Sequence, residues 1–325
     1  MSQISAAMRS MLSTPGPTVA VEVAPDVVTA VAVRWVKTGP VLAAHATEPL
    51  PPGAVSPGVA SSNIIDRAVV TEAVRAVLGR LPRRTSRVGL VIPDGAAKVS
   101  LLPFETVPGR VADLDELIRW RMRKAAPFRV EDAQLAHTPG TALPGGGREF
   151  IVVMMRRDIV EEYEAVCVDA GVQPGLVDLT SFNLINATLV DSPPPAFQDW
   201  VLVHVAAGYH TLAIIRGQDL IFFRNRAADD GDEGALTDLV HQSVMYYQDR
   251  LEGGGIHRTV LAVRTSGDRE GSERMTAMLK ERLDNSIEIV TPGLGAGGNG
   301  TGAPRSITDL AAPIGLLLRA GGAAA

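Results

Sequence analysis

Two stretches of this chain of 325 residues resemble each other without a gap, and this repeat restricts the possible folds more than any other feature. Residues 20–34 lie over residues 202–216 in one register. Glu22 falls on His204, and Thr29 falls on Thr211, each at the same offset (204 − 22 = 182). A duplicated fold, with one copy in each half of the chain, is therefore expected.

Each copy has the pattern of three consecutive β-strands. A run rich in β-branched residues meets a tight turn of small residues and returns as a second such run. A glycine turn, at Gly39 or at Gly217, then leads to a third run at residues 41–46 or 220–223. The pattern predicts a β-meander at the start of each half.

A helix and a further strand follow each meander. Possible N-cap residues at 61–63 precede apolar residues at helical spacing up to residue 80, and residues 234–252 show the same spacing in the second half. Short apolar runs follow at 88–92 and 259–263. Two copies of this element order predict two α/β domains that face each other across a central cleft.

Composition excludes several classes of protein. The net charge of −5 argues against a general nucleic-acid binder that is held by phosphate contacts. The single cysteine, Cys167, excludes an internal disulfide framework and a cysteine-cluster zinc site, which fits a reducing compartment. The most apolar window, residues 18–33, is interrupted by Glu22, Pro25 and Asp26, so no membrane-spanning helix is expected. We expect a cytoplasmic protein.

Several short stretches occur in an order and spacing that resemble the type IV pilus assembly protein PilM family, in the FtsA-like branch of the actin-like ATPases. They are residues 50–55, 91–93, 101–103, 117–128 with Glu131 and Asp132, 177–182, 222–224, Tyr246 with Tyr247, and 311–319. The resemblance covers residues 19–319 and implies a duplicated actin-like, or ribonuclease H-like, α/β fold with two domains around a central cleft. It also implies an inserted α+β subdomain in the first half.

The resemblance implies a division of the chain into four parts. These are a flexible tail at residues 1–17, a first domain at 18–92 and 175–192, the inserted subdomain at 93–174, and a second domain at 193–325. Inside the insertion we expect strands at 101–106 and 150–155, helices at 114–125 and 158–170, and an irregular connection at 138–147.

The first hairpin departs from the nucleotide-binding pattern of the actin-like fold. That pattern needs glycine and serine residues whose backbone N–H groups hold phosphates, and an aspartate for the metal. Here Glu22 keeps a carboxylate, but Ala24 adds a Cβ atom and Pro25 has no N–H to donate. Glu22 and Asp26 are the residues of this hairpin that would face a nucleotide.

The second hairpin departs further. His204 stands at the aspartate position and cannot replace a carboxylate on magnesium, and Ala206 stands at a glycine position. The late glycine pair is reduced to Gly267. His204, Gly208, Thr211 and Gly267 would face a nucleotide from this side, in a cleft that we expect to be degenerate.

We therefore expect no catalytic residue, no metal site and no resident cofactor. The alternative is an actin-like ATPase that binds ATP and magnesium in the cleft between the halves and hydrolyses the ATP. A cytoplasmic part of a type II secretion platform is a further alternative with the same fold.

Arg119 and Arg123 lie one turn apart on the helix expected within the insertion. They are either a solvated helix face or a contact for an acidic partner or anionic lipid head groups. In the PilM family, the inserted subdomain and the first domain form a groove for the cytoplasmic N-terminal peptide of the inner-membrane protein PilN. The resemblance therefore implies a non-catalytic scaffold at the inner face of the bacterial inner membrane, bound to a PilN-like protein and to other pilus assembly proteins. Membrane contact only through these partners is expected, and self-association is left open.

Overall fold

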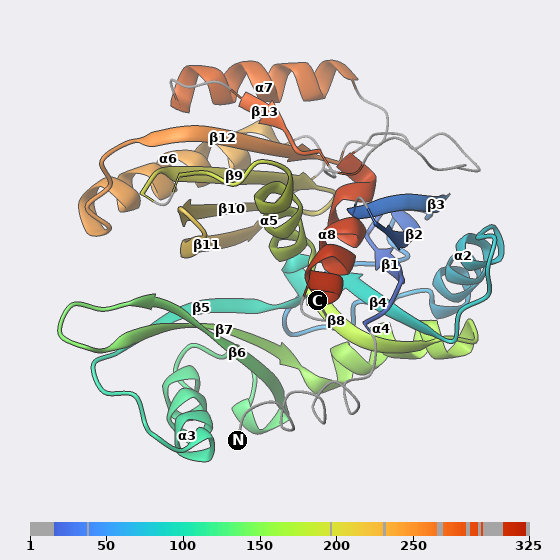
Figure 1. Ribbon diagram of the computed structural model, residues 1–325, viewed down its shortest axis with the longest axis horizontal. Coiled ribbons are helices and arrows are strands. Elements are labelled where there is room, and N and C mark those ends of the chain that lie inside the picture. The colour runs from blue at the N-terminus through green and yellow to red at the C-terminus, as the bar shows by residue number, and fades with distance from the viewer. Residues whose placement is uncertain are drawn as a thin grey trace.

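The computed structural model describes residues 16–37, 39–195, 197–229, 232–264, 269–283, 287–291, 294 and 308–322. Two five-stranded sheets and a three-stranded sheet are present in these ranges (Figure 1). Residues 1–15 of the tail expected at residues 1–17, and Gly267, lie outside the described residues.

The two five-stranded sheets have the same topology. The first has the order β3-β2-β1-β4-β8, and its strands are β1 (Val19–Val23), β2 (Val27–Val36), β3 (Gly39–Pro49), β4 (Arg87–Ile92) and β8 (Gln173–Leu179). The second has the order β11-β10-β9-β12-β13, and its strands are β9 (Asp199–Ala206), β10 (Tyr209–Arg216), β11 (Asp219–Ala227), β12 (Ile256–Val263) and β13 (Ile287–Ile289).

The repeat in the sequence is also a repeat in strand register. Glu22 pairs with Thr29 between β1 and β2, and His204 pairs with Thr211 between β9 and β10. In each sheet the first strand also pairs in parallel with the strand that follows the first helix. The predicted duplication, with Glu22 and His204 at equivalent places, is confirmed.

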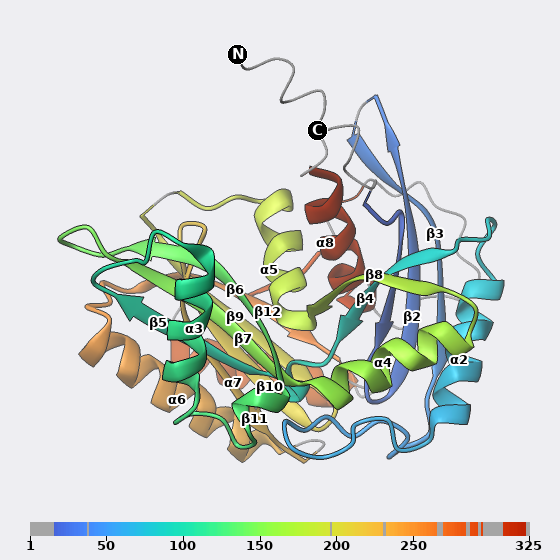
Figure 2. The same cartoon turned by 90° about the horizontal axis from the view of Figure 1, so that it is seen from below.

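Helices cover both sheets and fill the space between them (Figures 1 and 2). The helices are α2 (Arg67–Gly79), α4 (Arg157–Asp169), α5 (Thr180–Asp191), α6 (Glu233–Arg250), α7 (Arg269–Leu283) and α8 (Thr308–Gly322). α2 and α4 pack on the outer face of the first sheet, and α6 and α7 pack on the second. α5 and α8 share one core with both sheets.

α8 lies at the centre of the molecule, and most of its side chains are apolar. Its leucine and isoleucine side chains are buried, as are Ala311 and Ala312, which is typical of a helix enclosed by a core. A Cβ atom at Gly315 would lie 1.9 Å from the carbonyl oxygen of Asn183 in α5, so only glycine allows this close approach. No helix in the described ranges is both long and apolar enough to cross a membrane.

The predicted start of the first helix was wrong by several residues. α2 begins at Arg67, where the Asp66 side chain accepts a hydrogen bond from the backbone N–H of Val69 at 3.1 Å. Asn63 instead holds the preceding loop, because its side-chain amide donates to the carbonyl of Gly58 at 2.7 Å. Both residues are good capping residues, and only the path of the loop decides between them.

The region between β4 and β8 contains a three-stranded antiparallel sheet of order β5-β7-β6. Its strands are β5 (Lys98–Phe104), β6 (Ala133–Ala142) and β7 (Arg148–Arg156), and helix α3 (Val111–Met122) covers one face. The irregular connection expected at residues 138–147 was partly wrong, because residues 138–142 belong to β6. Pro139 is tolerated there because β6 is an edge strand, with a register shift between Pro139 and Ala142.

The second sheet begins with a tightly bound carboxylate that allows a test of stability. Arg216 donates two hydrogen bonds of 2.8 Å to Asp199, and the Tyr247 hydroxyl donates one of 2.7 Å. Burial alone would raise the pKa of Asp199, but these donors outweigh it and hold the pKa below the ordinary value. The ionised carboxylate therefore stabilises the folded state at neutral pH.

Asp199→Asn should lower the free energy of unfolding by about 1.5–3 kcal/mol at pH 7. The unfolded carboxyl group titrates at about pH 4 and the folded group titrates lower, so this stabilisation is lost as the pH falls from about 4 toward the folded pKa. Denaturant unfolding at several pH values measures the difference. Asp219→Asn, at an exposed position of β11, is the control. An effect of Asp199→Asn that stays constant down to acidic pH would contradict this account.

Candidate functional site

A buried polar cluster lies between the two five-stranded sheets, at the strands that the repeat relates. Glu22 in β1 and His204 in β9 are each about 1% exposed. Thr211 in β10 is fully buried. The structure thus brings together three of the residues that the sequence placed at the cleft.

On the first side of the cluster, Arg264 binds Glu22. Arg264 follows β12 directly, and its backbone N–H donates to the carbonyl of Val205 at 2.7 Å. Its guanidinium donates to Glu22 Oε2, while the Thr180 hydroxyl lies 3.2 Å from Oε1. Burial raises the pKa of Glu22, and the charge of Arg264 opposes that rise. The pair joins a strand of the first half to a strand end of the second.

On the other side, Asp94 collects donors from both halves. Asp94 lies just beyond β4, and its Oδ1 accepts a hydrogen bond of 2.9 Å from the backbone N–H of Ser181 in α5. Its Oδ2 accepts from the Ser181 hydroxyl and, at 2.9 Å, from the Thr211 hydroxyl. His204 Nδ1 lies 3.3 Å from the same oxygen, and Asn225 donates to Thr211 at 2.8 Å.

We call Glu22, Asp94, Ser181, His204, Thr211 and Arg264 the cleft network. It contains a serine, a histidine and an aspartate, but they are not arranged for nucleophilic catalysis. Ser181 Oγ and Asp94 Oδ2 both lie 3.3 Å from the same ring nitrogen of His204, whereas a catalytic relay uses one nitrogen for each partner. Asp94 and Ser181 are also fully buried. The network is suited to joining the two halves.

A cavity of about 440 Å³ lies beside the network, between the hairpin turns of the two halves. Pro25 and Asp26 line it from the first half, and Ala207 and Gly208 line it from the second. Asp26 Oδ1 is buried there without a hydrogen-bond partner in the described part of the chain. Asp26 and Gly208 therefore lie next to the cleft network and outside it.

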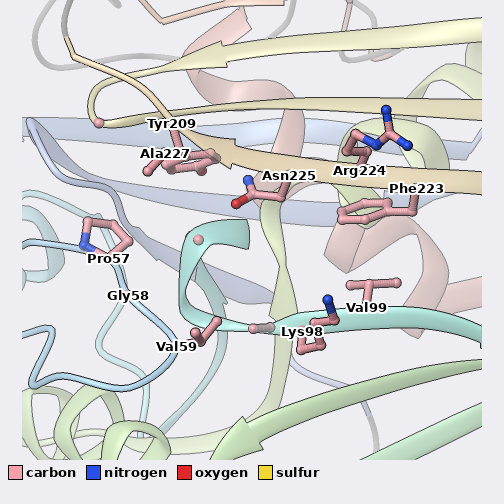
Figure 3. Close-up of a pocket in the computed structure, with 13 residues that line it drawn as sticks. Pro57, Gly58, Val59, Lys98, Val99, Tyr209, Phe223, Arg224, Asn225 and Ala227 are labelled. Carbon is pink, nitrogen blue, oxygen red and sulfur yellow. The ribbon is translucent and has the colours of Figure 1, made fainter. Parts of the chain in front are cut away.

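A second cavity, of about 480 Å³, lies between two sheet edges, and we call it the strand-edge groove (Figure 3). Lys98 and Val99 of β5 line one side, and residues 223–225 of β11 line the other. Pro57 and Val59 close one end. β5 and β11 are both terminal strands of their sheets. The groove thus combines an apolar lining, two cations and two strand edges.

The two arginines of the insertion lie away from this groove. Arg119 is exposed on α3, and Arg123 lies 3.4 Å from Glu131. α3 packs against Leu102 and Phe104 of β5, and strand alternation places Val99 on the opposite face of the sheet. Figure 1 shows α3 on one side of the three-stranded sheet and β11 on the other.

Sequence reasoning missed Asp94 and Ser181. The available signals were weak, since Asp94 directly follows the strand after the first helix and Ser181 lies within a stretch that resembles a known family. Arg264 lies in the stretch where the late glycine pair is reduced to Gly267, and its role as the partner of Glu22 depends on the folded arrangement. Among the described residues, no group of three or more His, Cys, Asp or Glu side chains is placed to hold a metal ion.

Comparisons with known proteins agree with the architecture. A family model described as type IV pilus assembly protein PilM matches residues 21–243. A chain from the solved structure of a PilM–PilN type IV pilus biogenesis complex is similar at a TM-score of 0.78 and 16% identity, over 95% of this chain and 99% of that chain. The fold is therefore actin-like, as expected from the sequence.

Two further solved structures are more distant. A Bacteroides thetaiotaomicron protein with an actin-like ATPase fold has a TM-score of 0.49 and 12% identity, over 86% of this chain and 93% of that one. The cytoplasmic domain of EpsL, an inner-membrane component of the type II secretion system of Vibrio cholerae, has a TM-score of 0.48 and 10% identity, over 94% of each chain. No curated protein matches the sequence.

Proposed function

This chain belongs to the type IV pilus assembly protein PilM family, and from that membership we propose that it is a scaffold that binds the cytoplasmic N-terminal tail of a PilN-like inner-membrane protein. The proposal places the protein at the cytoplasmic face of the inner membrane, where such a tail is reached. Contacts with other pilus assembly proteins, and self-association, belong to the same proposal.

The strand-edge groove is the observation that carries this proposal. Edge strands present backbone N–H and C=O groups that can pair with an extended peptide, and apolar pockets beside them select its side chains. β5 and β11 provide two such edges next to each other, and Val59 and Phe223 provide apolar surface. Lys98 and Arg224 also favour a tail that carries a carboxylate. We propose that the tail lies along this groove, which is bounded by the inserted subdomain and by β11 of the second half. This place differs from the groove between the inserted subdomain and the first domain that the resemblance implies.

We further propose that the cleft works without nucleotide hydrolysis. The residues present do not fit a magnesium–nucleotide complex, because Arg264 already binds the Glu22 carboxylate. In the first hairpin the Ala24 N–H donates to the carbonyl of Val27 at 3.0 Å, and Pro25 has no N–H. The cleft network then takes the place of a ligand and holds the halves together.

His204→Asp alone should not produce ATP hydrolysis. The change restores one carboxylate, but Pro25 still lacks a donor and Ala24 still carries its Cβ atom. Phosphate release measured with ATP and magnesium should stay at background for both the unmodified protein and the variant. Turnover by the unmodified protein that Glu22→Ala abolishes would show instead that the cleft is an ATPase site.

Reversing two charges on α3 tests the proposed role of the arginines. Arg119→Glu with Arg123→Glu should weaken tail binding severalfold at low salt, and the effect should fade as salt rises. Exposed charges act over only about 10 Å at 0.1 M salt, and α3 lies across the sheet from the groove, so these residues affect mainly the rate of association. Binding rates measured at several salt concentrations test this. If the association rates at low salt are unchanged, Arg119 and Arg123 form only a solvated helix face.

A further inference from the structure

A second surface of the first sheet combines positive charge with exposed apolar residues. A cavity of about 580 Å³ opens near the ends of β1 and β2, beside the loop that joins α2 to β4. Arg34, Trp35 and Arg83 line it together with apolar residues, namely Val19, Ala32, Val33, Leu42, Leu81 and Pro82. Trp35 is 46% exposed. This surface lies at the opposite end of β2 from the hairpin turn that faces the cleft.

Further cations extend this surface. Lys37 lies two residues beyond Trp35, and Arg84 adjoins Arg83. Arg87 begins β4, which is separated from β2 only by β1, so it lies at the same end of the sheet as Arg34. We call Arg34, Trp35, Lys37, Arg83, Arg84 and Arg87 the basic end of the first sheet. Its five cations form no ion pair with another residue of the described ranges, although the chain as a whole is acidic.

The repeat shows why Arg34 is unpaired. Its counterpart in the second half, Arg216, forms a two-bonded ion pair with Asp199. The same offset places Pro17 at the position of Asp199 (199 − 182 = 17), so the first half has no carboxylate there. The second copy of the repeat therefore neutralises Arg216, whereas the first copy leaves Arg34 exposed beside Trp35.

We propose that the basic end of the first sheet binds the head groups of anionic phospholipids directly. Clustered arginine and lysine residues are attracted to an anionic membrane surface, and tryptophan favours the boundary between head groups and acyl chains. The apolar cavity among the cations matches a ligand that is anionic at one end and apolar at the other. A nucleic acid would use the charge but leave the apolar cavity unused.

This contact goes beyond the proposed function, in which only the tail of a partner connects the protein to the membrane. A single weak surface contact is readily reversible, whereas two linked contacts raise the effective concentration of each for its target. The basic end and the strand-edge groove are separate surfaces, so each can be tested while the other is intact.

Co-sedimentation of the full chain with vesicles tests the proposal. The protein should bind vesicles of phosphatidylcholine with phosphatidylglycerol, and not vesicles of phosphatidylcholine alone. Arg83→Glu with Arg84→Glu should lower the partition coefficient at least about tenfold, because each cation near an anionic surface contributes about fivefold. Trp35→Ala should lower it severalfold at every salt concentration. Thermal unfolding confirms that each variant is folded.

The matched control is Lys280→Glu with Arg282→Glu, which changes the net charge equally at two exposed positions of α7. It should retain most of the binding. Equal loss in both double variants would overturn the proposal, because binding would then depend on net charge alone. The proposal would also be overturned if the unmodified protein bound both vesicles equally, or bound an acidic peptide such as polyglutamate and neither vesicle.

Discussion

Arg264→Met is expected to lower the free energy of unfolding by about 3–5 kcal/mol. The substitution keeps most of the side-chain volume but leaves Glu22 buried, ionisable and without its cationic partner. Burial disfavours the ionised form of Glu22, and the remaining donor, the Thr180 hydroxyl at 3.2 Å, cannot replace a guanidinium. Denaturant unfolding of the variant and of the unmodified full chain, both at the same pH, measures the loss.

Two controls separate this effect from a general loss of packing. Glu22→Leu combined with Arg264→Met removes both charges and should recover most of the stability, since a buried pair is often no better than apolar residues of similar volume. Arg67→Met breaks the exposed ion pair with Asp169 and should cost less than about 1 kcal/mol. If Arg264→Met costs no more than Arg67→Met, the cleft network does not hold the halves together.

Val59→Trp should weaken binding of the partner's tail at least about 30-fold, which is the scale of losing a central interface residue. Val59 lines the end of the strand-edge groove and is only partly buried, so a larger side chain there occupies the groove without disturbing a core. Fluorescence anisotropy with a labelled tail peptide measures the affinity, and the melting temperature should not change.

Val111→Trp is the matched control for this variant. Val111 is 72% exposed on α3, which packs on the other face of the three-stranded sheet. The same enlargement there should leave tail affinity unchanged. Equal affinity of the unmodified protein and Val59→Trp would place the tail elsewhere on the molecule.

The parts of this fold that depend on local pattern were predictable from the sequence. Alternating apolar residues and turn glycines gave the meanders, and one offset gave the shared register of Glu22 with Thr29 and of His204 with Thr211. The start of α2 was not predictable, because Asn63 and Asp66 are both good caps and tertiary contacts choose between them. The whole of β6 was also missed, and Pro139 in its second half signals a break that an edge strand tolerates.

The candidate site was predictable only where the repeat marks it. Glu22, His204 and Thr211 lie at repeated positions, so the comparison of the halves draws attention to them. Asp94 and Ser181 have no such mark, and 87 residues separate them in the chain before folding brings them into hydrogen-bond contact. The partner of each buried carboxylate depends on how α5 and β12 pack. No local sequence pattern contains that packing.

Calorimetric titration of the full chain with the cytoplasmic N-terminal peptide of its PilN-like partner, with and without magnesium and ATP, tests the central claim most directly. We expect one peptide to bind per chain, with the same affinity in both buffers, and we expect Val59→Trp to remove the signal. Failure of the peptide to bind, or binding only when ATP and magnesium are present, would contradict the proposal that the protein is a scaffold whose cleft is held closed by its own side chains.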